Sequence, residues 1–251
     1  MGNLDGKTTF ITGGGQGIGR GIALEMAKAG ANVIIAQRSD KAKIVVDEIK
    51  MLGRDAIAVN MDVTDFNSIQ KGVNTSFKYF SRIEILVNCA GVAIVEKGLD
   101  DASSEGFDLC YAVNLKGVWG VCKAMIPHFR ENHGGKIVNI ASIAGRRGSA
   151  GGEAYSVSKA GLINLTQSLA CSLSFDNVNV NAVCPGVIKT AMTERQKKEF
   201  KKNDYFDNFK NMTLLKRLPT PSDIGYAVVF FRHNKQTISQ DNRSMWIVAI
   251  V

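Results

Sequence analysis

The 251-residue sequence predicts an α/β fold in which one doubly wound parallel sheet is covered by helices on both faces. Two observations lead to this prediction. Apolar, β-branched runs alternate with stretches of helical period along almost the whole chain, as in repeated strand–helix–strand units. The strand-like runs are continuously apolar, which is typical of strands buried on both faces. Because no Pro- or Ser-rich linker divides the chain, we expect a single domain over residues 1–251.

Each expected element follows from its local pattern. Short runs rich in Val, Ile and Ala predict strands, in chain order, at residues 8–13, 32–37, 56–63, 83–91, 136–142 and 178–186. Longer stretches with apolar residues three and four positions apart predict helices at residues 19–30, 41–53, 66–80, 107–132 and 155–173. The tail SMWIVAIV, residues 244–251, is apolar and β-prone enough to add a last strand.

Composition bounds the class of protein. Hydrophobic residues make up 45% and charged residues 22% of the chain, which suits a globular protein with a sizeable core. No apolar run reaches the roughly 18 residues of a membrane span. The N-terminus also lacks a basic-then-apolar leader, so we expect a cytoplasmic protein that does not bind membranes. The five cysteines are scattered and only three histidines are present, so we expect reduced thiols and no metal site.

The positive charge of the chain is concentrated in one segment. Of the formal net charge of +8, residues 189–217 hold +5, because nine Lys and Arg stand against four Asp and Glu there. Charge gathered in one segment is a weak signal for nucleic acid, and we expect no nucleic-acid partner. The alternative, RNA binding through this segment, would show a steeply salt-dependent affinity.

The segment ITGGGQGIGRG near the N-terminus holds six glycines, which predicts a tight turn whose N–H groups approach a phosphate at a helix start. A nucleoside-triphosphate loop is excluded because Arg20 and Gly21 stand where Lys and Ser/Thr are needed. The G-x-G-x-x-G dinucleotide pattern fails because Ile18 and Arg20 occupy the positions of its last glycine. The spacing that fits is T-G-x-x-x-G-x-G, which runs from Thr12 to Gly19.

This spacing resembles that of the short-chain dehydrogenase/reductase family, whose members have a Rossmann fold. Further segments match the family's motifs in order over about residues 5–230: NMDVTD, NCAG, VNLKGVW, NIASIAG, YSVSK and CPGVIKT. The NCAG segment departs from the family's N-A-G pattern by carrying Cys89 in its second position. The resemblance implies hydride transfer between a nicotinamide cofactor and a small-molecule alcohol/carbonyl substrate, and a homo-oligomer, either a dimer or a tetramer.

The glycine loop, the end of the second strand and the matching motifs together imply which residues bind the cofactor. They are Gly13, Gln16, Gly17, Ile18, Gly19, Arg38, Asp62, Val63, Asn88, Ala90, Gly91, Tyr155, Lys159, Pro185, Gly186, Val187, Ile188 and Thr190. In this resemblance the NMDVTD segment contacts the adenine, and the CPGVIKT segment lies beside the nicotinamide.

The end of the second expected strand bears on the choice between NADP and NAD. An acidic residue there would accept the ribose 2′-OH of NAD. Gln37 stands in that place and Arg38 follows it, so a guanidinium can pair with the 2′-phosphate of NADP and no carboxylate repels it. We therefore expect NADP. The alternative remains NAD, with Gln37 bonded to the ribose and Arg38 a solvated surface cation.

The resemblance implies four catalytic residues, Asn114, Ser142, Tyr155 and Lys159. Tyr155 and Lys159 lie four residues apart on an expected helix, so their side chains project from one face. A free tyrosine, with a pKa of about 10, is a poor base. We expect the nearby ammonium to lower the pKa of Tyr155, which then exchanges a proton with a substrate hydroxyl, while Ser142 hydrogen-bonds the same oxygen. In the family the lysine also contacts the nicotinamide ribose, and the asparagine helps to hold a proton-relay water.

Taken singly, these residues have plainer interpretations. Tyr155 and Lys159 can form an ordinary amphipathic contact, and Ser142 can cap a strand end. Asn114 can cap or kink its helix. Their joint occurrence at the family's spacings favours an active site.

A Ser-His-Asp hydrolase is the rival chemistry. The chain has no G-x-S-x-G elbow, and His128, His133 and His233 stand at expected helix ends or in loops. We therefore set this alternative aside.

Residues 190–217 fall where the family carries a variable lid over the substrate. Their charge can attract an anionic substrate, such as a phosphorylated sugar or an acyl thioester. The plainer interpretation, which we favour, is a solvated helix face. We expect four aromatic side chains of the segment to close the pocket: Phe200, Tyr205, Phe206 and Phe209.

The C-terminal tail, residues 232–251, departs from the family, whose members end in a strand resembling I-T-G-Q-x-I-x-V-D-G-G. From Gln236 onward the tail reads QTISQDNRSMWIVAIV, and its possible codons, read one frame over, are compatible with ITGQSINVDCG. We hypothesise a frameshift between about residues 231 and 236, biological or from sequencing. Resequencing the coding DNA tests this hypothesis. The changed ending also puts the family's usual oligomer in doubt.

The sequence therefore predicts an NADP(H)-dependent oxidoreductase whose substrate is a polyol, a sugar or a 3-oxoacyl thioester. The alternative function is a catalytically impaired member of the family, a pseudoenzyme or an interaction subunit disabled by its tail.

Overall fold

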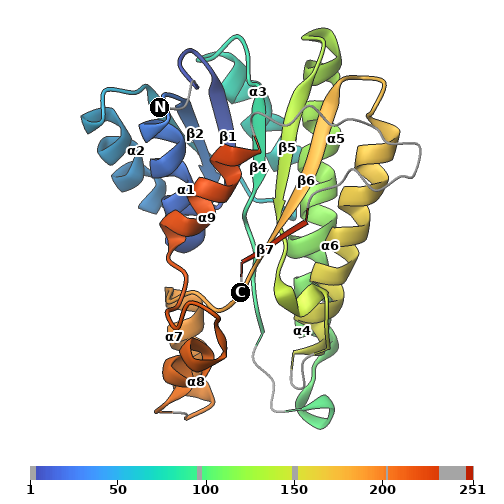
Figure 1. Ribbon diagram of the computed structural model, residues 1–251. Coiled ribbons are helices and arrows are strands. Elements are labelled where there is room, and N and C mark those ends of the chain that lie inside the picture. Colours follow the sequence, from blue (N-terminus) through green and yellow to red (C-terminus); the bar gives the residue numbers. More distant parts are fainter. Residues whose placement is uncertain (1–3, 95–97, 149–151, 202, 232–246, 251) are drawn as a thin grey trace.

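The structure is a computed structural model that describes residues 4–94, 98–148, 152–201, 203–231 and 247–250. Its strands form one parallel sheet in the order β3-β2-β1-β4-β5-β6-β7 (Figure 1). The strands are β1 (Thr8–Thr12), β2 (Asn32–Gln37), β3 (Ala56–Asn60), β4 (Ile85–Asn88), β5 (Gly135–Ile140), β6 (Val178–Pro185) and β7 (Ile247–Ile250). The helices are α1 (Gly17–Lys28), α2 (Lys41–Met51), α3 (Phe66–Phe77), α4 (Ser104–Tyr111), α5 (Gly117–Glu131), α6 (Glu153–Ser172), α7 (Ala191–Glu199), α8 (Tyr205–Met212) and α9 (Pro221–Phe230).

Helices cover both faces of the sheet, so the predicted doubly wound α/β fold is confirmed. Helices α1, α2 and α9 lie on one face, where Ile22 and Ile224 are buried against the sheet (Figure 1). Helices α3, α5 and α6 cover the other face with side chains such as Val121 and Leu162. Strand order reverses between β1 and β4, and in such sheets ligands bind at the carboxyl ends of the strands beside this point.

Several strands end earlier than the sequence predicts, and the difference matters for the site. Strand β3 was expected to reach residue 63 and β4 residue 91, but they end at Asn60 and Asn88. The segments 61–63 and 89–91 leave the sheet and line a cavity at its carboxyl edge. Continuous apolar character does not show where a chain stops pairing, because cavity walls are apolar too.

The expected long helix at residues 107–132 is divided into three parts. Helix α4 begins at Ser104, a π-helical segment follows over Ala112–Lys116, and α5 continues to Glu131. A π turn widens the helix and redirects the side chains inside it. Asn114 lies within this segment.

The C-terminal part brings two additions. Helix α9, which the sequence analysis did not identify, begins with a capping box in which Thr220 and Asp223 each accept a backbone N–H of the other. Strand β7 pairs in parallel with β6, Ala182 opposite Ile247, and confirms the expected last strand. The rest of the tail, with His233 and the hypothesised frameshift, lies outside the described residues.

Beyond the sheet, α7 and α8 lie together at one end of the molecule (Figure 1). They are two short helices within residues 190–217, the segment for which the family resemblance predicts a lid and which is called the lid below. In the part of the chain that the structure describes, no helix is long and apolar enough to cross a membrane.

Candidate active site

The glycine loop joins β1 to α1 in a conformation that larger residues would not fit. Gly13 and Gly17 have φ of +70° and +53°, in the left-handed region that glycine favours. A Cβ on Gly19 would overlap the carbonyl oxygen of Gly13. At the start of α1, Gln16 makes no side-chain capping hydrogen bond. The first N–H groups of this helix therefore suit a phosphate.

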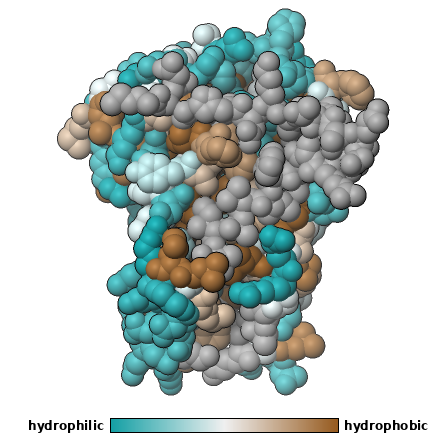
Figure 2. Space-filling model, viewed as in Figure 1, coloured by the Kyte–Doolittle hydropathy of each residue, from teal (hydrophilic) through white to brown (hydrophobic). Residues whose placement is uncertain are grey.

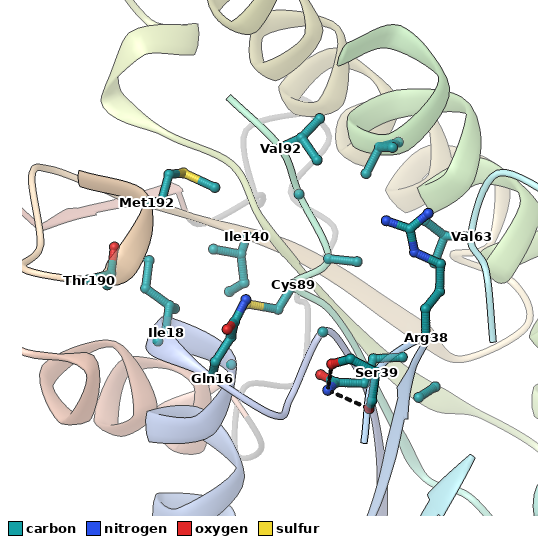
Figure 3. Close-up of a pocket in the computed structure, with 18 of the residues that line it drawn as sticks. Gln16, Ile18, Arg38, Ser39, Val63, Cys89, Val92, Ile140, Thr190 and Met192 are labelled. Atoms are coloured by element: carbon teal, nitrogen blue, oxygen red, sulfur yellow. Dashed lines mark hydrogen bonds between the residues drawn. The ribbon is translucent and has the colours of Figure 1, made fainter. Parts of the chain in front are cut away.

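Gln37 supports the loop from the end of β2. The backbone N–H of Gly15 donates to Gln37 Oε1 at 2.8 Å. Gln37 Nε2 donates to the carbonyl and the hydroxyl oxygen of Ser39, at 3.0 and 2.9 Å (Figure 3). Both ends of the Gln37 amide are thus engaged within the protein, where the sequence analysis left open a bond to a ribose.

Arg38 follows Gln37 and lines the cavity at the carboxyl edge of the sheet, called the cleft below. Its side chain is 72% exposed. Its Nη1 is 3.2 Å from Asp62 Oδ2. Burial acts to raise the pKa of Asp62, but hydrogen bonds from Thr64 and the charge of Arg38 outweigh it and lower that pKa. A second cation, Lys41, donates to Gln16 Oε1 at 2.8 Å. Two cations and one paired carboxylate therefore border this end of the cleft.

Most predicted cofactor residues line one cavity of about 330 Å³. They are Gly13, Gln16, Gly17, Ile18, Gly19, Arg38, Asp62, Val63, Ala90, Gly91, Tyr155, Lys159 and Thr190. Figure 3 shows side chains from the glycine loop, the ends of β2, β4 and β5, and the start of the lid around this space. Lining residues that sequence reasoning missed include Ser39, Met61, Cys89, Val92, Ile140 and Met192. Their only signal is their position just after a strand or at the start of the lid.

The remaining predicted cofactor residues lie elsewhere. Asn88 is buried behind the cleft, and its Nδ2 donates to Asn139 Oδ1 at 2.9 Å, which ties β4 to β5. Pro185 ends β6, and Ile188 is buried in the core beside α1 and α9. Gly186 and Val187 line a second, neighbouring cavity.

Tyr155 and Lys159 project from the first turns of α6, and the structure corrects the expected effect of one on the other. Lys159 Nζ donates to the carbonyl oxygen of Ile140 at 2.8 Å and lies 5.8 Å from the centre of the Tyr155 ring. Burial raises the pKa of Tyr155, and a hydrogen bond with Ser142 only partly opposes this. The expected net lowering of the pKa of Tyr155 is therefore wrong for the cofactor-free protein, because desolvation of the buried phenol outweighs the polar groups around it.

Lys159 itself is buried, and burial lowers its pKa to about 8. Near neutral pH it is still mostly protonated, so a buried ammonium lies beside the phenol. Such a charge, held in a low-dielectric site, favours any negative charge that develops nearby.

The lowered pKa of Lys159 makes stability depend on pH in a known direction. An unfolded lysine keeps its proton up to about pH 10.4, whereas folded Lys159 releases it near about 8. Between these values the unfolded chain binds the extra proton, so the free energy of unfolding rises with pH. We expect the Tm of the cofactor-free wild type, minus that of Lys159→Met, to rise from about pH 8 to about pH 10. Calorimetry checks this, and a flat or falling difference would contradict it.

Asn114 lies inside the protein and lines neither cavity. Its Oδ1 accepts the N–H of Val92, and its Nδ2 donates to the carbonyl oxygen of Val92, both at 2.9 Å. Nδ2 also donates to Ser158 Oγ at 3.0 Å, and that hydroxyl donates to the carbonyl oxygen of Tyr155 at 2.7 Å. Asn114 thus fixes the segment after β4 against the turn of α6 that carries Tyr155.

A second cavity, of about 690 Å³, lies under the lid, and Tyr155 lines both cavities. Ser142 lines the second cavity from the end of β5, and its Oγ accepts the N–H of Ala144 at 3.1 Å. Of the four aromatic residues expected to close the pocket, Phe200, Tyr205 and Phe209 line it. Phe206 is absent from the lining and instead lies within 5.7 Å of two lysine Nζ atoms, a distance measured to its ring centre.

His128 and His133 do not line either cavity. His128 is buried in α5, and its Nε2 accepts the backbone N–H of Ile83 at 3.0 Å. His133 ends the turn after α5 with a φ of +58°. Over the described residues, no three His, Cys, Asp or Glu side chains are grouped to hold a metal ion.

Comparison with known proteins gives one consistent family. The family described as short chain dehydrogenase matches residues 7–201. Oxidoreductase UcpA of Salmonella typhimurium is 38% identical over 241 residues, which cover 94% of this chain and 91% of that protein. The 3-oxoacyl-acyl-carrier-protein reductase FabG of Staphylococcus epidermidis is 33% identical over 231 residues, which cover 91% of this chain and 92% of that protein.

Solved structures with nicotinamide cofactors have the same fold as this chain. NAD⁺-bound xylitol dehydrogenase superimposes with a TM-score of 0.90 and 25% identity, over 99% of this chain and 98% of that one. ElxO with NADP bound superimposes with a TM-score of 0.86 and 26% identity, over 97% of this chain and 96% of that one.

Proposed function

Because the chain belongs to the short-chain dehydrogenase family, we propose that it transfers a hydride between NADP(H) and an alcohol/carbonyl substrate, with Tyr155 as proton donor and acceptor. The predicted family is confirmed, and the protein is an oxidoreductase that acts on CH–OH or carbonyl groups. The observation that carries the proposal is that Tyr155 lies where the two cavities meet, with Ser142 on one side and Lys159 on the other.

The first cavity fits a dinucleotide. A Cβ on Gly19 would overlap the carbonyl oxygen of Gly13, and one on Gly13 would press on the backbone of Ala90, so the tight turn before α1 needs glycine at both positions. The uncapped start of this helix offers N–H groups to a diphosphate. The adenine end would lie beside the Arg38–Asp62 pair, and the nicotinamide end near Tyr155 and Lys159. When bound, a nicotinamide cofactor supplies or accepts the hydride.

The chain's own residues then manage the proton. In reduction, the substrate oxygen accepts hydrogen bonds from Ser142 and Tyr155, and Tyr155 gives up its phenol proton as negative charge grows on that oxygen. Ser142 Oγ already accepts the N–H of Ala144, which leaves its hydroxyl hydrogen to donate. The ammonium of Lys159 stabilises the phenolate that remains. In oxidation the same steps run in reverse.

We place Asn114 as a positioning residue. Its bonds to Val92 and Ser158 hold the cleft wall and the start of α6 at a fixed distance. The water-holding role that the family resemblance implies for it stays a prediction.

The choice of NADP over NAD rests on Arg38 and on Gln37, an amide at the position where an acidic residue would accept the ribose 2′-OH of NAD. Relatives do not decide it, since xylitol dehydrogenase was solved with NAD⁺ and ElxO with NADP. A 2′-phosphate would meet the guanidinium of Arg38, now paired with Asp62.

We expect Arg38→Gln to weaken NADPH binding by about 10–100-fold, because a charge-assisted hydrogen bond to the 2′-phosphate is lost. NADH has no 2′-phosphate, so its binding should be unchanged. Fluorescence titration with both cofactors measures this. Arg82→Gln is the matched control, because Arg82 pairs with Glu84 away from the cleft. Equal losses for NADPH and NADH would refute the role of Arg38.

The substrate is proposed among polyols, sugars and 3-oxoacyl thioesters, in line with what FabG and xylitol dehydrogenase are named for. Incubation of the enzyme with NADPH and a panel of ketones and oxoacyl thioesters, or with NADP⁺ and polyols, tests the function. Tight NADPH binding with no turnover of any compound would favour the pseudoenzyme alternative. We also propose a cytoplasmic homo-oligomer, a dimer or tetramer, which light scattering of the purified chain tests.

A further inference from the structure

Resting on the proposed function, we propose that the substrate carries a carboxylate and that Arg147 binds it in the cavity beside Tyr155. Arg147 was not among the residues that the sequence analysis selected. It lies in the loop after β5, five positions beyond Ser142.

The charge of the second cavity favours an anion. Among the described residues that line it, Arg147 is the one charged side chain and none is a carboxylate. Within the described part of the chain, the guanidinium of Arg147 has neither a salt bridge nor a hydrogen-bond partner. A cation that faces a cavity without a counter-charge is a site for a negatively charged group.

The position of Arg147 gives the direction in which the substrate lies. Tyr155 lines both the cofactor cavity and the second cavity. Arg147 lines the second cavity and also a smaller one, of about 80 Å³, which neither Tyr155 nor Ser142 lines. Arg147 does not line the cofactor cavity, so it belongs to the part of the substrate space that the cofactor cavity does not share. A substrate with its carbonyl at Tyr155 would extend its other end toward Arg147.

The rest of the lining fits a molecule with an apolar body and a single negative charge. Val187, Phe200 and Phe209 supply apolar wall. Ser156 also lines the cavity, and its buried Oγ has no hydrogen-bond partner among the described residues, so it can serve a polar atom of the substrate. One guanidinium binds one carboxylate through two parallel hydrogen bonds, whereas a phosphate dianion would keep an uncompensated charge.

The lid adds long-range attraction. Residues 189–217 hold +5 of the chain's formal charge of +8, because nine Lys and Arg stand there against four Asp and Glu. Figure 2 shows a hydrophilic surface over α7 and α8, two helices that contribute Gln196 and Phe209 to the lining of this cavity. Charge of one sign around a cleft raises the local concentration of an oppositely charged substrate.

The test compares linear oxo acids of increasing chain length with their methyl esters as substrates for NADPH-dependent reduction. For the wild type we expect a higher kcat/KM for the acid than for its ester. Arg147→Met is expected to lower kcat/KM for the acid by about 10–100-fold, through KM, and to leave that for the ester unchanged. Arg147→Lys keeps the charge without the paired hydrogen bonds, so its value should be intermediate. Arg146→Met is the matched control, since the neighbouring Arg146 lines none of these cavities.

A binding measurement separates this proposal from the proposed function. Hexanoate and hexanamide, which have no ketone or aldehyde group to reduce, are titrated into the enzyme in the presence of NADP⁺. Hexanoate binding that Arg147→Met abolishes supports the carboxylate site, even if no oxo acid is reduced and the proposed function fails. The site is overturned if hexanoate and hexanamide bind alike, if neither binds, or if acids and esters lose activity equally in Arg147→Met. A preference for oxo phosphates or thioesters over oxo acids would likewise overturn it.

Discussion

Tyr155→Phe is expected to lower kcat for carbonyl reduction by about 10²–10⁴-fold, the usual contribution of a positioned acid or base. The ring stays in place and only the phenolic hydroxyl group is lost, so NADPH affinity should change little. The pKa of Tyr155 is raised by burial, so the phenol holds its proton at neutral pH and donates it in reduction. Stopped-flow measurement of NADPH oxidation, with a separate fluorescence titration, gives both quantities.

Tyr226→Phe is the matched control, because Tyr226 is 61% exposed on α9 and lines neither cavity. It should retain wild-type kcat. An active Tyr155→Phe enzyme would contradict the assignment, and an equal loss in both variants would point to a general effect on folding.

Gly19→Ala is expected to weaken NADPH binding by about 10–100-fold. Overpacking that forces the backbone to shift costs about 1–3 kcal/mol, and a loss of that size in binding free energy gives this change in affinity. The new methyl group would overlap the carbonyl oxygen of Gly13, and backbone atoms cannot move aside as a flexible side chain can. The shift would distort the turn that presents the start of α1. Fluorescence titration and urea unfolding measure affinity and stability side by side.

Two other glycine variants serve as comparisons for Gly19→Ala. A Cβ on Gly17 has room, since its nearest neighbour is Thr190 Cγ2 at 3.5 Å, but the φ of Gly17 is +53°. Gly17→Ala should therefore lower the free energy of unfolding by about 1–2 kcal/mol because of backbone conformation alone. A Cβ on Gly98 would meet nothing within 4 Å, so Gly98→Ala should bind NADPH like the wild type. Full NADPH affinity in Gly19→Ala would contradict the phosphate-cradle interpretation of the loop.

The sequence predicted the fold well where the hydrophobic periodicity and the turn-forming or polar residues at the ends of an element indicate the same bounds. Strand β2 has the predicted bounds, since the turn at Gly30 precedes it and the polar residues Gln37 and Arg38 close it. The α/β alternation and the continuously apolar strands followed from burial on both faces. Helix α9 was missed although the sequence TPSD carries its start signal, a capping box with Pro at the first position.

Details that depend on tertiary partners were beyond sequence reasoning. The π segment around Asn114 places that side chain against Val92 and Ser158, contacts that no local pattern encodes. The hydrogen bond from Lys159 Nζ to the carbonyl oxygen of Ile140 depends on where β5 ends relative to α6.

The same limit applies to the cavity walls. Spacing located the glycine loop and the Tyr155–Lys159 pair, but not which strand-end residues face the cleft and which lie behind it. Asn88 and Ile188 belong to the second group. Arg147 stands in a loop without periodicity, so its place in the second cavity emerges only from the packed chain.

The most direct test of the central claim follows the hydride itself. The enzyme is incubated with NADPH deuterated at one or the other C4 position, together with the carbonyl panel, and the alcohols are analysed by mass spectrometry. The account predicts deuterium at the former carbonyl carbon from one of the two labelled forms, in the wild type and not in Tyr155→Phe. If the wild type binds NADPH and yet transfers deuterium to no carbonyl compound, the proposed oxidoreductase function is contradicted.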